Sequence, residues 1–384
     1  MNTRRVLQPL ASLRLTVILL GIGMVLVFAA TLDQVNLGIH AVEKKYIRSL
    51  YVLWQVPGLG FVHLPLPGGY LLGSVLLVNL LAAHVTRFKL SWKKSGIFMI
   101  HLGVILLIVG EILRGLLADE TRMSLDEGQS SNYSEALREV ELVVIDRDPD
   151  QGRDQVVAIP QHLLEKGGEI RHPSLPFSIH IQEYLRNSNL EMRSEVPKAP
   201  PSPATTGLGV QIHVEPRPVA TKPDEVDLPS AFVEIRSAGG ALGTWLLSSV
   251  FDDTQSFTAD GKTFHLALRG RRDYKAFSLG LIDFSHDRYA GTDIPKNFSS
   301  RVRLKHPEAG VDREVLIYMN NPLRYGGYTF YQASFANAER TSILQVVKNP
   351  AWLMPYVAFG LVGVGMLLQF SSHLGRFSKS RRSS

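Results

Sequence analysis

Residues 96–117 read GIFMIHLGVILLIVGEILRGLL, an apolar run in which only His101, Glu111 and Arg114 are ionisable. A membrane-spanning helix needs about 20 mainly apolar residues to cross a hydrocarbon core of about 30 Å. Three further runs meet this requirement, at 13–32, 69–88 and 351–370. The alternative, a buried core helix, is hard to apply to four such runs in one soluble domain. We therefore predict four transmembrane helices.

Basic residues next to these runs predict the orientation of the chain. They lie in the tail at 1–12, in the connection at 89–95 and in the tail at 371–384, and these segments contain no Asp or Glu. Because basic flanks remain in the cytoplasm, we expect both termini to be cytoplasmic. The formal net charge of +6 then reflects membrane flanks, and we expect no nucleic-acid binding.

The first apolar run has the basic start of a signal peptide, but it is long and no clear small-residue cleavage site follows it. We expect it to be retained as an anchor. The predicted organisation is a cytoplasmic tail (1–12), transmembrane helices at 13–32, 69–88, 96–117 and 351–370, an external loop (33–68), a cytoplasmic loop (89–95), an external domain (118–350) and a cytoplasmic basic tail (371–384).

Composition excludes several kinds of chemistry. The 384 residues include no cysteine, which excludes disulfides, cysteine nucleophiles and thiolate metal sites in this chain. Apolar residues make up 45% and charged residues 20%, so the chain is not of the disordered class. The sequence has no Walker loop, no HExxH and no GxSxG, and the histidines between residues 162 and 306 lack metal-ligand spacing.

The external segment 118–350 is predicted to be β-rich. Apolar residues alternate with polar ones in short runs bounded by Gly, Pro, Asn and Asp, a pattern typical of strands. The runs are 138–145, 177–181, 210–214, 231–235, 263–268, 300–304 and 314–318. The predicted fold class is thus an integral membrane α-helical protein with a large external β-rich domain between the third and fourth helices.

The external loop 33–68 is predicted to contain an amphipathic helix. In residues 40–56, Ile47, Leu50, Tyr51 and Trp54 recur at helical spacing, with charged residues elsewhere. Such a helix suits the membrane surface, where Tyr and Trp lie at headgroup level. A helix packed on the external domain is the alternative.

Two histidines could carry chemistry within the membrane. His101 lies between one and two turns into the third helix, where an ionisable group is costly and usually has a partner or a task. A neutral imidazole can bind haem iron; a structural hydrogen bond between helices is the alternative. His84 would reach a similar depth if the second and third helices form a hairpin, and the two could then form a bis-imidazole haem site. A position at the interface, reaching water, is the alternative for His84.

Other ionisable residues near the membrane have simpler interpretations. Glu111 and Arg114 are spaced for a local ion pair on one helix, although a polar cavity is another role for Glu111. His40 and His63 lie in the external loop and could line a site at the outer surface, or could simply be solvated.

The run DIPKNFSSRVRL at 293–304, followed by NNPLRYGGYTFYQASF at 320–335, resembles the ResB-like (CcsB-type) family of cytochrome c biogenesis proteins. The resembling positions are Pro295, Phe298, Ser300, Asn320, Pro322, Leu323, Tyr325, Gly327, Tyr331 and Gln332. The exit of the first helix is also similar, at Thr31 and Gln34, while Ala30 and Asp33 depart from the commoner pattern. The same run is typical of a hairpin, with its turn at residues 324–327.

The resemblance implies a subunit of a membrane complex that delivers haem and attaches it to apocytochrome c outside the membrane. Its implied partners are a separate CcsA/ResC-type haem-handling membrane protein, apocytochrome c, thioredoxin-like thiol reductants and membrane lipid. The implied location is the bacterial plasma membrane, with the large domain in the periplasm. Haem would be bound transiently and non-covalently (b-type), and the histidine implicated in related proteins corresponds to His101. The resemblance implies a non-catalytic or co-catalytic role in the haem-attaching complex.

Two other functions remain open at this stage. One is a membrane electron carrier that holds a single b-type haem between His84 and His101. The other is a non-catalytic assembly or sensor protein, in which the external domain binds another protein and the helices only anchor it.

Overall fold

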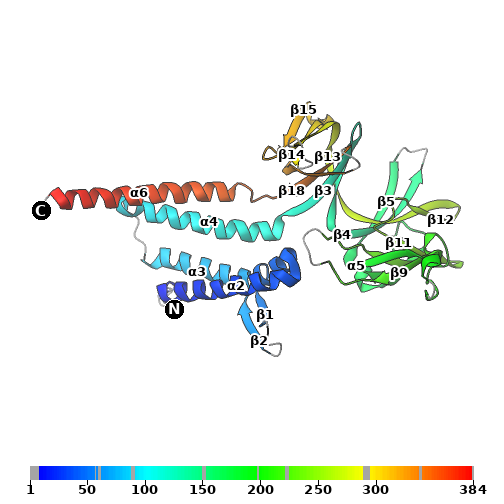
Figure 1. Ribbon diagram of the computed structural model, residues 1–384, viewed down its shortest axis with the longest axis horizontal. Helices are drawn as coiled ribbons and strands as arrows, with labels where there is room; N and C mark the ends of the chain where they lie inside the picture. The colour runs from blue at the N-terminus through cyan, green and yellow to red at the C-terminus, as the bar shows by residue number, and fades with distance from the viewer. Residues whose placement is uncertain are drawn as a thin grey trace. The chain divides into compact units, whose positions relative to one another are not determined.

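The computed structural model describes residues 8–382 apart from 57, 59–61, 88–90, 149–152, 197–198, 221–224, 289–294 and 337–339. The chain divides into two compact units (Figure 1). The helical unit contains the described residues up to Asp119 and from Lys348 onward, and the β unit contains the described residues between them.

Four long helices make up most of the helical unit: α2 (Leu13–Val42), α3 (Gly69–Arg87), α4 (Ser95–Leu117) and α6 (Met354–Arg382). Each contains a stretch long and apolar enough to cross a membrane, and most side chains in these stretches are not buried within the unit. This is the surface that lipid would cover. The four predicted helices are present, while their insertion into a membrane stays a prediction.

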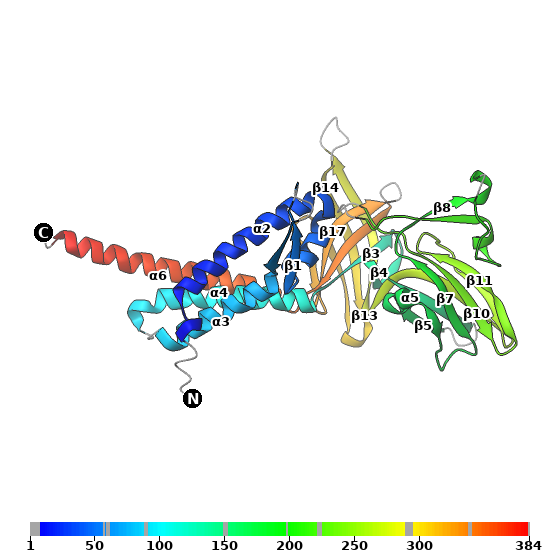
Figure 2. The same ribbon diagram turned by 90° about the horizontal axis from the view of Figure 1, so that it is seen from below.

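Helices α4 and α6 pack closely along their length and lie side by side in both views (Figures 1 and 2). The contact depends on glycines at every seventh position of α4, namely Gly96, Gly103 and Gly110, all buried. A Cβ atom on Gly103 would lie 2.7 Å from the carbonyl oxygen of Ala358. Small residues of this kind let two helix backbones approach in lipid, where apolar burial alone does not drive association.

The predicted amphipathic helix over 40–56 is wrong in its second half. Helix α2 continues into the π-helix η1 (Glu43–Ile47), but β1 (Tyr51–Gln55) is a strand that pairs with β2 (His63–Pro67). The residues of β1 satisfy a two-residue alternation as well as a helical one, and Val52 and Trp54 are buried in one cluster with residues of α2. Pairing with β2, which local periodicity does not reveal, makes this segment a strand and not a helix.

The turn before this hairpin is held by a buried phenol. Tyr46 is fully buried, and its hydroxyl donates a hydrogen bond of 2.6 Å to Asp33, which also accepts one of 2.7 Å from Lys45. Burial, together with the adjacent carboxylate, raises the pKa of Tyr46 well above its ordinary value. The phenol therefore remains protonated and keeps donating to Asp33.

The β unit contains short helical segments and many strands. Its short helices are α5 (Gln161–Lys166), η3 (Arg193–Glu195), η4 (Leu208–Val210) and η5 (Pro307–Ala309). Its strands are β3 (Asp119–Asp126), β4 (Ser130–Asp148), β5 (Arg153–Pro160), β6 (Gly168–Ile170), β7 (Ser178–Leu185), β8 (Ser188–Met192), β9 (Ile212–Pro216), β10 (Ser230–Ser237), β11 (Gly240–Ser248), β12 (Gln255–Ala259), β13 (Lys262–Arg288), β14 (Pro295–His306), β15 (Val311–Tyr318), β16 (Leu323–Tyr325), β17 (Tyr328–Ala336) and β18 (Thr341–Lys348). Each of the seven predicted runs overlaps one of these strands, which confirms the β-rich prediction.

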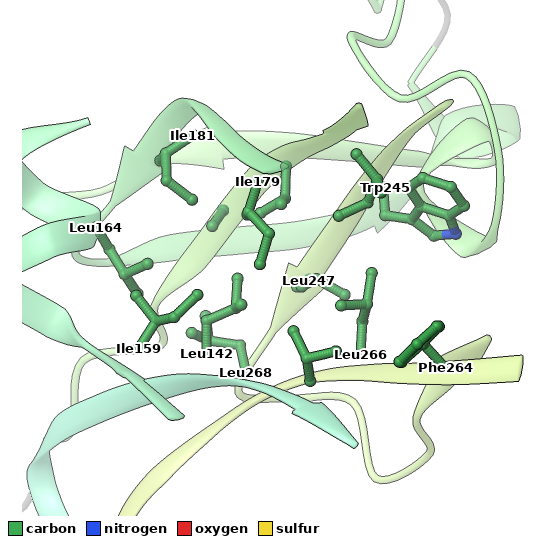
Figure 3. Packing of buried hydrophobic residues seen from close by; sticks show 14 of the residues in the cluster. Leu142, Ile159, Leu164, Ile179, Ile181, Trp245, Leu247, Phe264, Leu266 and Leu268 are labelled. Carbon is green, nitrogen blue, oxygen red and sulfur yellow. The ribbon is translucent and has the colours of Figure 1, made fainter. Parts of the chain in front are cut away.

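Two large hydrophobic cores support most of these strands, and a smaller cluster around Phe232 and Leu246 packs against β8 and β9. The first core lies between the sheet ordered β11-β10-β7-β6 and the strands β4, β5, β12 and β13, and Figure 3 shows Ile179, Leu247 and Leu266 meeting within it. The second core contains Leu279, Phe330 and other side chains of β3 and β13–β18. Strand β13 supplies residues to both cores, with breaks in its pairing to β4 between Gly270 and Arg272 and between Tyr274 and Leu279.

The run that carries the family resemblance closes the second core. Strands β16 and β17 form the predicted hairpin, with Gly326 and Gly327 at its turn, both at positive φ (59° and 82°). The hydroxyl of Ser300 donates 2.6 Å to the side-chain carbonyl of Gln332 and lies 2.6 Å from Ser342. Two resembling positions far apart in sequence therefore meet in one buried polar network.

We predict that Gly326→Ala destabilises the β unit more than Gly327→Ala. Both changes force an L side chain into the left-handed region, at about 1–2 kcal/mol. A Cβ atom at position 326 would also lie 2.8 Å from the ring of Phe277 in the second core, whereas the space around position 327 is open. Overpacking of this kind adds about 1–3 kcal/mol.

The measurement is chemical denaturation of the full chain in detergent, monitored by aromatic fluorescence. Equal losses of stability in the two variants would show that Phe277 does not confine the turn.

Candidate functional site

The structure brings His84 and His101 together within the helical unit. His84 lies near the end of α3 and His101 lies in the second turn of α4, so both are close to the α3–α4 connection. Their ring centroids are 5.0 Å apart and the ring planes meet at 79°. The hairpin arrangement expected for these two residues is therefore observed, while haem binding by them stays a prediction.

The hydrogen bond of His84 sets which of its nitrogens is basic. Its Nδ1 atom lies 2.9 Å from the carbonyl oxygen of Leu80, one turn earlier in α3. Because a carbonyl oxygen only accepts, Nδ1 carries the proton and Nε2 has the lone pair that a metal would take. Phe98 contacts the His84 ring edge to face, with the centroids 6.0 Å apart, so part of the surroundings is apolar.

His101 differs because it makes no hydrogen bond to any residue that the structure describes. Its Nδ1 atom is buried and has no partner there. The alternative of a structural hydrogen bond between helices is therefore not observed in the described chain. A buried polar atom without a partner is costly and calls for an explanation such as a ligand or an ion. Together, the two imidazoles provide nitrogen donors of the kind that haem iron accepts.

An ion-pair cluster lies at the other end of α4. Arg114 contacts Glu111 at 3.5 Å, which confirms the predicted local pair. The same guanidinium also lies 3.3 Å from Glu43, which in turn pairs with Arg48 at 2.8 Å. Local sequence spacing does not predict Glu43 as a partner of Arg114, because the two residues lie far apart in the chain. This cluster connects η1 to α4.

The remaining candidates do not gather into a site. His63 is exposed on β2, and the side chain of His40 lies outside the described part of the structure. Among the described residues, no group of three or more His, Asp or Glu side chains could hold a metal ion. His84 and His101 are thus the best-placed candidates for contact with a metal-containing ligand.

Comparisons with known proteins point to one family. A model of the ResB-like family matches residues 238–354. The protein NrfI of Wolinella succinogenes is 37% identical over 101 residues, which are 26% of this chain and 11% of that protein. The resemblance to the ResB-like family is confirmed. This chain spans about a tenth of the length of the curated relative that it matches.

The ResB-like match covers β11–β18 and ends at the first residue of α6. It therefore includes nearly all strands of the second core, and with them the Ser300–Gln332 contact and the β16–β17 hairpin. The match supports a role in cytochrome c biogenesis. His84 and His101 lie outside the ResB-like segment, so their roles depend on the geometry of α3 and α4.

We predict that His101→Leu leaves the thermal stability of the full chain unchanged or raises it. The imidazole makes no hydrogen bond among the described residues, so an apolar side chain of similar size removes an unsatisfied polar atom and breaks no bond. The measurement is the melting temperature in detergent, with Asn79→Leu as the matched control. Asn79 is buried in α3 and its side chain makes hydrogen bonds of 2.5–3.1 Å to Leu10, Ser12 and Thr16.

A marked loss of stability in His101→Leu, similar to that in Asn79→Leu, would contradict this prediction. It would mean that the imidazole holds the helices together.

Proposed function

We propose that this chain is a subunit of a membrane complex that matures c-type cytochromes. It helps to deliver haem across the membrane and to attach it to apocytochrome c on the outer side. The observation that carries the proposal is the ResB-like match over the strands of the second core. The four long apolar helices support a membrane location for this work.

Haem is the cargo in this proposal, and His101 is its first contact within the helices. The buried Nδ1 of His101 has no partner in the described chain, so binding iron would replace no existing hydrogen bond. His84 supports the same role, because its proton is directed to Leu80 and its basic nitrogen is Nε2. Apolar surroundings, such as Phe98, suit the porphyrin.

Other components must supply the chemistry that this chain lacks. The sequence has no cysteine, so the thiols that receive haem belong to apocytochrome c, and thioredoxin-like proteins would keep them reduced. We assign attachment itself to a CcsA/ResC-type membrane partner, with this chain as a non-catalytic or co-catalytic subunit. The basic flanks favour an orientation with both termini in the cytoplasm and the β unit on the outer side, and the resemblance to the ResB-like family implies that the membrane is the bacterial plasma membrane and the outer side the periplasm.

Deleting the gene is expected to abolish covalently attached c-type haem while b-type haem persists. The reason is that only c-type cytochromes need haem delivered to the outer side and joined to thiols. The measurement is haem staining of denatured membrane proteins, with b-type haem read from the absorption spectrum of the same membranes. Normal c-type cytochromes in the deletion strain would contradict the proposal.

Within the complex, His101→Ala is expected to lower the haem that copurifies by about tenfold or more, as loss of a metal-binding contact does. His84→Ala is expected to cause a smaller loss, and His63→Ala, at an exposed position in β2, is the matched control. The measurement is haem per protein in the complex purified with its partner. Haem unchanged in His101→Ala would remove this residue from the site.

The placement of His84 and His101 on the adjacent helices α3 and α4 supports a second candidate, a membrane electron carrier with one b-type haem, whose binding would require the two rings to move apart from their 5.0 Å contact. A spectrum of the chain purified without partners separates the two functions. A reversible low-spin spectrum that both histidine variants abolish would favour the carrier, while loss of c-type cytochromes on gene deletion favours the proposal above.

A further inference from the structure

The β unit contains a cavity of about 350 Å³ that the proposed function does not use. Parts of β3, β4 and β7 line it, together with the segment 226–229 that precedes β10. All of the lining residues belong to the β unit. The volume lies at the lower end of the range for ligand sites, about 300–1,000 Å³. It suits a small molecule or one or two side chains.

Three arginines line this cavity: Arg122, Arg138 and Arg186. Its acidic residues, Glu135 and Asp227, already have partners. Glu135 accepts a hydrogen bond of 2.8 Å from Arg272, whose guanidinium also lies 3.9 Å from the ring of Tyr133. Asp227 lies 3.7 Å from Arg186 and accepts a hydrogen bond from the backbone of Ala220.

The other two arginines are not matched in this way. The exposed side chains of Arg122 and Arg138 form no hydrogen bond or ion pair within the described chain. Because Arg272 pairs with Glu135 and Arg186 lies beside Asp227, Arg122 and Arg138 leave two positive charges without a carboxylate partner among the described residues. This excess of positive charge favours an anionic ligand.

A tyrosine hydroxyl is a further hydrogen-bond donor at this cavity. Tyr184 lines the cavity, and its hydroxyl is buried without a hydrogen-bond partner in the part of the chain that is described. Burial raises its pKa to about 12. The hydroxyl therefore stays neutral at physiological pH and can donate a hydrogen bond to an acceptor in the cavity.

The backbone next to the cavity departs from regular pairing. The register between β13 and β4 shifts between Gly270 and Arg272. A Cβ atom on Gly270, which also lines the cavity, would lie 2.8 Å from the carbonyl oxygen of Ala136. Such irregularities redirect side chains and are common beside binding sites. Here the irregularity falls on the strand that carries Glu135 and Arg138.

We propose that this cavity binds a monocarboxylate attached to an apolar body. The planar guanidinium groups of Arg122 and Arg138 match a carboxylate in shape and charge, and the hydroxyl of Tyr184 supplies a further donor. Met123, Val140 and Leu228 provide apolar lining for the body of the ligand. The carboxylate could belong to a free organic acid or to a polypeptide. The proposal goes beyond the proposed function and does not depend on haem.

The test is calorimetric titration of the full chain in detergent with four probes: phenylacetate, phenylacetamide, inorganic phosphate and the blocked dipeptide acetyl-Phe-Glu-amide. We expect at least one carboxylate probe to bind about tenfold or more tightly than phenylacetamide and phosphate. Tighter binding of phenylacetate identifies a free acid as the source, and tighter binding of the dipeptide identifies a polypeptide.

Substitutions of residues that line the cavity test whether the carboxylate binds there. The double change Arg122→Gln and Arg138→Gln is expected to weaken the carboxylate about tenfold or more. Arg313→Gln is the matched control, because Arg313 is exposed on β15 and is likewise unpaired in the described chain. Tyr184→Phe retains the ring and removes only the unpartnered hydroxyl, so this variant is expected to fold and to bind more weakly.

Three results would overturn the proposal. They are equal binding of phenylacetamide and phenylacetate, tighter binding of phosphate than of either carboxylate, and unchanged carboxylate affinity in both the arginine and the tyrosine variants. Absence of binding by both carboxylates at millimolar concentration would overturn it as well. None of these results depends on cytochrome maturation, so the two proposals fail independently.

Discussion

The close packing of α4 against α6 constrains the rest of the chain, because the whole β unit is inserted between these two helices. Gly96, Gly103 and Gly110 bring the helix backbones together. The two ends of the insertion must then lie next to each other, and they do, since β3 and β18 are neighbours in one sheet. Ordering so long an insertion is less costly when its ends are already paired.

Within the β unit, β13 has a similar connecting role. It contributes Leu266 to the first core and Leu279 to the second. Between these positions Lys275 is fully buried, where its ammonium group donates to Ser134 at 2.6 Å and lies 4.6 Å from the ring of Tyr328. A buried charge is tolerated only when its partners are well placed. Lys275 thus fixes the part of β13 between the two cores against Ser134 and Tyr328.

Each of the two proposed sites contains a buried polar group that has no hydrogen-bond partner in the described chain. In the helical unit it is the imidazole of His101, and in the β unit it is the buried hydroxyl of Tyr184. Leaving such groups unsatisfied costs stability, and binding a ligand recovers that cost. In the ResB-like segment, by contrast, polar side chains such as Ser300 and Gln332 are hydrogen-bonded to each other. The positions that resemble the family are therefore explained largely by their role in stabilising the fold.

Length, alternation and turn chemistry are local properties, so the amino-acid pattern was sufficient to predict the four apolar helices, the β-rich insertion and the hairpin at Gly326 and Gly327. It also indicated His84 and His101 as candidates through their position in apolar runs. Long-range contacts, by contrast, make Tyr51–Gln55 a strand and pair Arg114 with Glu43. The same holds for the meeting of Ser300 with Gln332 and for the grouping of Arg122, Arg138 and Tyr184 around one cavity. These outcomes depend on partners distant in the chain, and local sequence patterns carry no information about which distant residues will meet.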